Sequence, residues 1–459
     1  MNTSSLRSRL LSLAIHGQLV PQDPNDEPAS ALLARIQAEK ANAEKGKKRS
    51  PKPSTSVVNA PFEVPEGWCW TTLGKIGDVV TGSTPSKDVK EYYNGDIPFF
   101  KPTDLEQGID TKYSNDHLSQ LGYEVSRQIP ANSVLVTCIG ATIGKTGMIT
   151  VDGTCNQQIN AIIPSKAVSS VFLYMVCVSN FIQKQIKENA SATTLPILNK
   201  NNFARILFPL PPLPEQHRIT RVLTALFAQN DKIDEAKATL RTLVQRAKAK
   251  VLDLAIHGKL VPQLPEEENA AEVVKRICPD ADVVTEGVPE GWCQTILGNL
   301  FSHNTGKALN ASNKEGELKE YLTTSNVYWN SFDFSVVKKM LFKESELEKC
   351  TITKGDLLVC EGGDIGRAAI WNYDYDICIQ NHIHRLRPKF DLCVPLYYYF
   401  LMYLKQNNMI AGKGIGMLGL SSNALHKISV PLPPLPEQHR IVAKIGEIFR
   451  ELERIEGSL

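Results

Sequence analysis

The most informative absences in this 459-residue sequence concern membranes, metals and net charge. No apolar run approaches the roughly 18 residues that a membrane-spanning helix needs. The ten cysteines form no C-x-x-C pair and show no Cys/His spacing typical of a metal site. The 51 basic residues balance 49 acidic ones to a net charge of +2, so overall charge does not indicate a nucleic-acid partner. We therefore expect a cytoplasmic protein with buried free thiols, in which any nucleic-acid contact relies on local basic patches or on partner subunits.

Motifs for catalysis are missing as well. The string GATIGKT at residues 140–146 has three residues between its glycines, whereas a phosphate-binding loop needs four before Lys-Ser/Thr. Its second copy, GGDIGRA at residues 362–368, lacks the Lys-Thr pair altogether. There is no Asp/Asn-Pro-Pro-aromatic motif for methyl transfer to an amino group, and His382 and His384 alternate on an expected strand without a third metal ligand. The sequence therefore predicts a noncatalytic chain that binds no metal and no cofactor of its own.

What the sequence contains instead is a long internal repeat. PLPPLPEQHRI occupies residues 209–219 and returns at residues 431–441. VPEGWCWTTLG from residue 64 pairs with VPEGWCQTILG from residue 288, and CIGATIGK from residue 138 pairs with CEGGDIGR from residue 360. The regions between these strings diverge strongly. Such self-similarity predicts a repeated framework that carries two different domains.

A long helix is expected directly after the first proline-rich string. Because proline holds the chain extended and is tolerated in the first helical turn, the string forms a rigid connection from a domain into a helix. Apolar residues then recur every seven positions, which favours a coiled coil over a single amphipathic helix on a globular core. These positions are Ile219, Leu226, Ile233, Leu240, Ala247 and Leu254 in the first copy and Ile441, Ile448 and Ile455 in the second.

The second helix is divided between the two ends of the chain. The sequence after the second string stops at residue 459, and the LAIHG string that should follow occurs from residue 13, as well as from residue 254. The repeat is therefore circular. We expect an α+β protein in which two mixed α/β domains are separated by a long antiparallel helical coiled coil, with a pseudo-twofold, circularly permuted repeat.

The expected boundaries follow from the strings and from local composition. A polar, basic stretch with no apolar period predicts a flexible linker at residues 37–63. Its KGKKR run could contact DNA or a partner, but the counterpart linker is acidic, which weakens a shared role. In order, we expect an N-terminal helix (1–36) completing the distal helical region, the linker (37–63), the first domain (64–208), the central helical spacer (209–263), a second linker (264–287), the second domain (288–430) and a C-terminal helix (431–459).

The paired PLPPLPEQHRI and LAIHG strings, the VPEGW domain openings and the circular repeat resemble the specificity subunit of type I restriction–modification systems over essentially the whole chain. The resemblance implies two target-recognition domains, each reading one half of a split duplex DNA site, and conserved helices that form the spacer. It implies docking of methyltransferase (modification) subunits, usually two, that bind S-adenosylmethionine and methylate adenine. It also implies restriction subunits that add ATP-driven translocation and cleavage. S-adenosylmethionine, ATP and Mg are thus expected on partner subunits, in a phage-defence complex that involves no membrane.

Candidate DNA contacts are chosen by side-chain chemistry, since lysine and arginine suit phosphates or guanine while asparagine and glutamine suit adenine. In the first domain they are Ser83, Thr84, Lys87, Lys101, Lys145, Gln157 and Gln158. In the second domain they are Lys307, Thr324, Asn326, Arg367, Asn381, His382 and Lys413. The histidine and arginine of each proline-rich string are candidates for docking a partner subunit: His217, Arg218, His439 and Arg440.

Two other classes of function stay open at this point. A structural coiled-coil adaptor with two protein-binding heads predicts no salt-dependent DNA binding, whereas phosphate contacts impose a steep salt dependence. A self-contained methyltransferase or nuclease predicts S-adenosylmethionine binding or DNA modification by this chain alone, and the missing motifs count against it.

Overall fold

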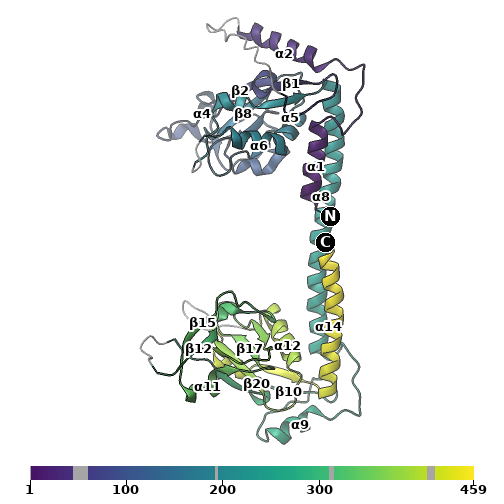
Figure 1. Cartoon of the computed structure of the whole chain (residues 1–459), viewed down its shortest axis with the longest axis vertical. Helices are drawn as coiled ribbons and strands as arrows, with labels where there is room; N and C mark the ends of the chain where they lie inside the picture. The colour runs from purple at the N-terminus through teal and green to yellow at the C-terminus, as the bar shows by residue number, and fades with distance from the viewer. Residues whose placement is uncertain (1, 45–59, 192–194, 310–314, 411–418) are drawn as a thin grey trace. The chain divides into compact units, whose positions relative to one another are not determined.

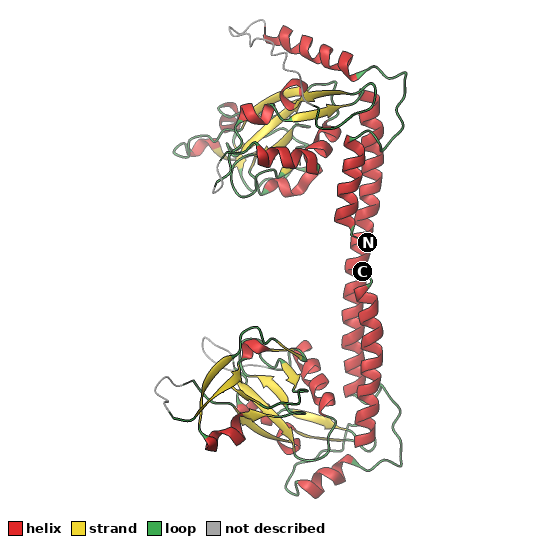
Figure 2. Cartoon of the chain, in the orientation of Figure 1, coloured by secondary structure: helices red, strands yellow, loops and turns green. Residues whose placement is uncertain are grey.

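The computed structural model describes residues 2–44, 60–191, 195–309, 315–410 and 419–459, so the KGKKR run lies outside the described residues. The chain divides into two compact units, Met1–Ala236 and Lys237–Leu459. Helix α8 (Leu213–Ile256) begins in the first unit and continues into the second (Figure 1). Both units combine helices with small sheets, as Figure 2 shows, so the expectation of a mixed α/β protein is confirmed.

The first unit is built around a four-stranded antiparallel sheet with the order β2-β8-β5-β6. The sheets β4-β3-β7 and β1-β9 complete it. The strands are β1 (Cys69–Thr72), β2 (Gly77–Thr81), β3 (Tyr93–Phe100), β4 (His117–Leu118), β5 (Val134–Thr137), β6 (Thr146–Met148), β7 (Thr154–Cys155), β8 (Ile159–Pro164) and β9 (Leu207–Leu210). The helices are α1 (Thr3–Ile15), α2 (Ala29–Glu44), α3 (Leu73–Ile76), α4 (Gln120–Glu124), α5 (Ser170–Cys177), α6 (Asn180–Glu188) and α7 (Lys200–Ala204), with 3-10 turns η1 (Lys90–Tyr92) and η2 (Asp104–Asp110).

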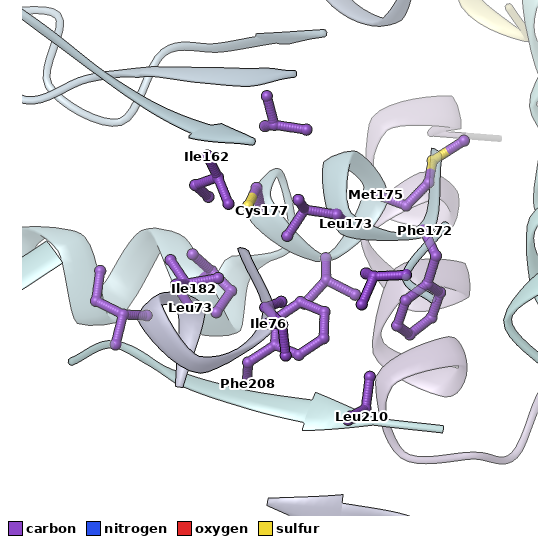
Figure 3. Packing of buried hydrophobic residues seen from close by; sticks show 14 of the residues in the cluster. Leu73, Ile76, Ile162, Phe172, Leu173, Met175, Cys177, Ile182, Phe208 and Leu210 are labelled. Atoms are coloured by element: carbon purple, nitrogen blue, oxygen red, sulfur yellow. The ribbon is translucent and has the colours of Figure 1, made fainter. Parts of the chain in front are cut away.

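The core of the first unit lies where helices cover its sheets. Strand β5 reads VLVT and is buried at every position, as expected for a central strand covered on both faces. Helix α5 contacts β5 and β6, and α6 contacts β9. Helix α6 buries Ile182 and Ile186, which are four residues apart and so share one face. Figure 3 shows side chains of both helices gathered with Phe208 and Leu210 of β9 in one apolar cluster, which holds the sheets and their connecting loops in place.

The second unit repeats the central sheet, now as β11-β20-β17-β18, and adds the sheets β15-β12-β19-β16, β10-β21 and β13-β14. Its strands are β10 (Cys293–Ile296), β11 (Phe301–Thr305), β12 (Glu317–Leu322), β13 (Val327–Tyr328), β14 (Ser331–Phe332), β15 (Lys338–Phe342), β16 (Thr351–Ile352), β17 (Leu357–Cys360), β18 (Ala368–Ile370), β19 (Ile377–Ile379), β20 (Ile383–Pro388) and β21 (Ser429–Leu432). Its helices are α9 (Ala270–Ile277), α10 (Leu297–Leu300), α11 (Glu344–Cys350), α12 (Val394–Gln406), α13 (Ser422–His426) and α14 (Leu435–Gly457), with the 3-10 turn η3 (Thr324–Asn326).

One turn differs in length between the two central sheets. Val136 pairs with Thr146 in the first unit, and Val359 pairs with Ala368 in the second. The turn between these strands is therefore one residue shorter in the second unit. This corrects the sequence alignment of the CIGATIGK and CEGGDIGR strings, because Cys360 is the last residue of β17 whereas residue 138 follows the end of β5.

In each unit a terminal helix runs antiparallel to part of α8. The contacts between α1 and α8 include the Arg7–Asp231 ion pair and a 2.8 Å hydrogen bond from Asn230 Nδ2 to Thr3 O. Helix α14 contacts the last part of α8 through ion pairs of Lys248 with Glu453 (3.5 Å) and Glu456 (3.6 Å).

The predicted heptad positions are unevenly buried. Ile219 and Ile441 are fully buried, whereas Leu226, Ile233 and Ile455 are 38%, 37% and 41% exposed, and Leu240, Ala247, Leu254 and Ile448 are half-buried. The most buried row on α8 runs instead through Leu223, Asn230, Val244 and Val251, which are also spaced by multiples of seven. The row through Leu223 faces the terminal helices, as the contact between Asn230 and Thr3 shows. The predicted row lies beside it, at the edge of the contact between the helices.

Candidate nucleic-acid interface

Strand register brings several loops of the first unit to one edge of its sheets. Thr81 at the end of β2 pairs with Asn160 in β8, and the end of β5 pairs with the start of β8. The end of β3 adjoins the same place, because Asn156 N donates to Phe100 O at 3.1 Å. We call residues 82–87, 101, 138–145 and 156–158 the first loop edge. It carries all of the contacts predicted for the first domain: Ser83, Thr84, Lys87, Lys101, Lys145, Gln157 and Gln158.

Polar side chains of the first loop edge are linked to one another and to neighbouring carboxylates. Thr84 Oγ1 donates to Gln157 Oε1 at 2.6 Å, and both residues are exposed. Exposed ion pairs contribute little to stability, so a lysine held in one can exchange its carboxylate for a phosphate at small cost. Two lysines of this edge are in such pairs, Lys145 with Glu106 (2.8 Å) and Lys101 with Asp116 (2.5 Å). Lys87 is exposed, and Ser83 and Gln158 are half-buried.

The glycines of the GATIGK string shape the turn at this edge. Gly140 and Gly144 have φ values of 96° and 91°, a left-handed conformation that other L-residues rarely adopt. Gly144 N donates to Thr137 O at 2.8 Å and closes the turn, which places Lys145 at its exit. The turn in the second unit uses Gly363 and Gly366 in the same way, with φ values of 73° and 81°. The backbone conformation of the turn therefore explains why glycine occurs at these positions in both units.

The same arrangement of loops recurs in the second unit. Register pairs that bring the strand ends together are Thr305 with His384, Cys360 with Ile383, and Leu322 with Ile379. The loops after β11, β12 and β17 and the loop into β20 therefore form a second loop edge (residues 306–307, 323–326, 361–367 and 380–382). Predicted contacts on it are Lys307, Thr324, Asn326, Arg367, Asn381 and His382. Lys413 lies outside the described residues.

Two residues of the second loop edge use their polar side-chain groups in contacts inside the domain. Asn326 is 2% exposed; its Oδ1 accepts from Thr323 N at 2.9 Å and its Nδ2 donates to Val336 O at 2.9 Å. Both ends of the amide are satisfied, so the assignment of Asn326 as a base contact is corrected to a turn cap. Lys307 Nζ lies 2.6 Å from Glu346, and its side chain is 11% exposed, which makes it an internal ion pair.

Tyr328 is a residue of this region that side-chain selection from sequence missed. Its ring is exposed, and the guanidinium carbon of Arg367 lies 5.0 Å from the ring centroid. Arg367 Nη2 also donates to Thr324 O at 2.5 Å. His382 is exposed beside Glu361, with Nδ1 3.1 Å from Oε2. No sequence signal links Tyr328 to Arg367, because the two lie in different strings and meet through the contact between β13 and β18.

The proline-rich string forms a joint in each unit. In the first joint the buried carboxylate of Glu215 accepts from Trp68 Nε1 (2.9 Å) and Gln22 Nε2 (3.0 Å). The equivalent carboxylate in the second unit accepts at the same two distances: Glu437 from Trp292 Nε1 (2.9 Å) and Gln263 Nε2 (3.0 Å). Burial raises the pKa of Glu437. Each joint ties the segment that follows a helix end, the opening of a domain and the start of a long helix to one side chain.

Other residues of the string are also used inside each unit. Gln216 Oε1 accepts from Ser169 N at 2.9 Å, and Gln438 Oε1 accepts from Cys393 N at 3.0 Å. The docking candidates divide into two kinds. Arg218 is paired with Asp26 (2.6 Å) and Arg440 with Glu267, whereas His217 and His439 are exposed.

Comparison with known proteins decides the family. Residues 65–241 and 289–457 match the family described as "Type I restriction modification DNA specificity domain". The chain belongs to this family. These specificity subunits are noncatalytic members of type I restriction–modification systems, and they recognise DNA sequence.

Relatives of this specificity subunit align over nearly its full length. The EcoAI specificity subunit of Escherichia coli is 26% identical, with 98% of this chain and 89% of the relative covered. The EcoBI specificity subunit of Escherichia coli is 22% identical over 87% of this chain and 83% of the relative. A chain of a type I R-M system structure (TM-score 0.62, 21% identity, 87% and 94% covered) and the HsdS subunit from Thermoanaerobacter tengcongensis (TM-score 0.53, 20% identity, 87% and 93% covered) share the fold.

A metal site and a membrane-spanning helix are both absent from the described part of the specificity subunit. Among its described residues no group of three or more His, Cys, Asp or Glu side chains is arranged to hold a metal ion. None of the described helices combines the length and the apolar character needed to cross a membrane.

Proposed function

We propose that this specificity subunit reads a bipartite, asymmetric duplex DNA site, with one half-site for each recognition domain. The observation that carries the proposal is the pair of loop edges, which occupy the same position on sheets of the same strand order but present different side chains. Contacts to phosphates position a protein on DNA, whereas contacts to base edges specify sequence. Two equivalent edges with different side chains suit two half-sites of different sequence.

The helices around α8 suit a spacer between the two domains. We propose that α1 and α14 together complete an antiparallel coiled coil with α8, in a circularly permuted repeat with pseudo-twofold symmetry. Support comes from the antiparallel contacts of each terminal helix with α8 and from the two matching joints. The wholly structural adaptor finds no comparable support, because it gives no reason for the polar loop edges.

The repeated frame also suggests how partner subunits are placed. We propose that the frame docks adenine-N6 methyltransferase subunits, two per specificity subunit, together with restriction subunits. S-adenosylmethionine, ATP and Mg then belong to those partners. The exposed His217 and His439 are equivalent points at which two copies of one partner can make the same contact.

A domain exchange tests the bipartite reading. Residues 64–208 are replaced by the corresponding domain of another specificity subunit, and methylated adenines are mapped in cells that carry the partner subunits. We expect one half of the methylated site to change and the other half to persist. Loss of both halves would contradict the proposal. The absence of salt-dependent DNA binding by this chain would instead favour the adaptor.

A further inference from the structure

The cations on the two loop edges differ in whether a carboxylate neutralises them. Lys101, Lys145 and Lys307 each lie within 3 Å of an Asp or Glu oxygen. Among the described residues, no carboxylate lies within ion-pair distance of Arg367. The segments of the second unit outside them, residues 310–314 and 411–418, contain no Asp or Glu. A half-buried arginine without a counter-charge is costly unless a ligand supplies acceptors.

Arg367 is nevertheless held in one orientation. Tyr328 lies under the guanidinium, with its ring centroid 5.0 Å from the guanidinium carbon, and Nη2 donates to Thr324 O. The guanidinium also lies beside the Cys360 thiol, and its Nε is buried without a hydrogen-bond partner among the described residues. A planar group stacked on an aromatic face loses little further freedom when it binds, which suits bidentate recognition.

The internal repeat distinguishes a base contact from a phosphate contact. Arg367 directly precedes β18, and Lys145 directly precedes β6, so the two residues occupy equivalent places in the two sheets. Both domains must approach the same kind of sugar–phosphate backbone, but they need different base contacts. Here one domain has a lysine bound to Glu106, and the other has a stacked arginine without a carboxylate. A difference of this kind is expected where sequence is read.

We propose that the Tyr328–Arg367 pair is a guanine-reading element of the second recognition domain, with Arg367 donating to guanine O6 and N7 and Tyr328 holding the guanidinium plane. This inference rests on the proposed DNA-reading function. It predicts that the half-site read by the second domain contains at least one guanine on which binding depends.

The test uses the complex of this chain with its methyltransferase subunits and duplexes that carry its mapped site. Each guanine of the second half-site is replaced in turn by 7-deazaguanine, which keeps base pairing but lacks the N7 acceptor. We expect one replacement to weaken binding by roughly 10–100-fold, and Arg367→Ala to weaken binding to the unmodified duplex similarly. Combining the variant with that replacement should add little further loss.

Three further variants test whether the loss of binding comes from the planar guanidinium, from its charge or from unfolding of the domain. Arg367→Lys keeps the charge but not the planar fork, so most of the loss should remain. Tyr328→Leu should give a smaller loss at the same guanine. Lys354→Ala removes a cation of the same domain that pairs with exposed Asp374, and it should leave the discrimination unchanged. Thermal unfolding of each variant checks that the domain is folded.

Several outcomes overturn the inference. A second half-site without guanine does so directly, as does wild-type affinity of folded Arg367→Ala. An equal loss on cognate and unrelated duplexes, with the salt slope reduced by about 1, identifies a phosphate contact instead. In these three cases the proposed function stands. If the wild-type complex did not distinguish its site from unrelated DNA, the proposed function and the inference would fail together.

Discussion

The indole nitrogen of Trp68 donates a 2.9 Å hydrogen bond to the buried carboxylate of Glu215, across 147 positions of sequence. Gln22 donates to the other oxygen of the same carboxylate. Because Glu215 begins the long helix and Trp68 opens the recognition domain, this side chain fixes how one part is attached to the other within the first unit.

Removing the carboxylate should destabilise the first unit. In Glu215→Leu the buried Trp68 Nε1 loses its acceptor, and an unsatisfied buried donor costs about 1–3 kcal/mol, whereas Gln22 Nε2 keeps Gly17 O as an acceptor at 2.7 Å. Glu215→Gln keeps an acceptor oxygen and should cost less. Chemical denaturation of both variants measures the difference, and equal stability of the leucine variant and the wild type would contradict the role of the joint.

The second unit should lose stability in acid through its histidines. His303 Nε2 lies 2.9 Å from His384 Nδ1, and His384 Nε2 donates to Leu420 O at 2.7 Å. Burial, with the neighbouring cations, lowers the pKa of His303 to about 3, and burial lowers the pKa values of His384 and His426. The unfolded chain therefore binds more protons, so this contribution is present above about pH 6.5 and falls as pH drops toward 3.

The equivalent positions of the first unit show which residues can replace these histidines. Strand register places Val79 and Asn160 of the first unit where the second has His303 and His384, and Gly74 lies against Ala204 as Gly298 lies against His426. The triple variant His303→Val, His384→Asn, His426→Ala should unfold with a flatter pH dependence between about pH 6.5 and 4. An unchanged slope would show that other groups cause the acid sensitivity.

Two glycine-to-alanine substitutions should change the free energy of unfolding in opposite directions. A Cβ on Gly306 would lie 1.9 Å from Ile379 O, so Gly306→Ala must displace the second loop edge and destabilise the unit. Gly446 lies within α14, and an added methyl group would meet nothing within 4 Å, so Gly446→Ala should stabilise by about 0.5–1 kcal/mol. Thermal unfolding of the two variants side by side is the measurement; the same sign for both would contradict this account.

The first loop edge should show its role in the salt dependence of DNA binding. If Lys101 and Lys145 exchange their carboxylates for phosphates, each alanine substitution should reduce the slope of log K against log salt by about 0.9. Lys200→Ala, on α7, removes an exposed cation that lies outside the loop edge. A slope that falls equally in this control would argue against the assignment.

The sequence predicted the repeated framework better than the side chains that act on it. The duplicated strings located both joints, since identical strings make the same hydrogen bonds through Glu215 and Glu437. Which residue would be central to the joint could not be read from them, because Trp68 and Gln22 meet Glu215 only in the folded unit. The helix was expected, but the buried row through Leu223 depends on the direction from which another helix approaches.

Selection by side-chain type could not show which polar side chains are already engaged inside a domain. Loops rich in polar residues did gather on one edge in each unit, because strand ends meet there. Asn326 has the right chemistry for adenine, yet its amide is consumed by backbone groups around a turn. Tyr328 shows the reverse case, since an aromatic residue was not selected although it lies under Arg367.

The pairing of β1 with β9 and of β10 with β21 has a consequence for how such proteins change over generations. Cys69 lies opposite Leu210, and Cys293 lies opposite Leu432, so the chain enters and leaves each recognition domain through adjacent strands. Genetic recombination within the flanking repeated strings can therefore replace everything between those two points, and the incoming segment meets the frame at two neighbouring places of fixed geometry. If each domain reads its own half-site, one such exchange gives a chain with a new DNA specificity and an unchanged frame.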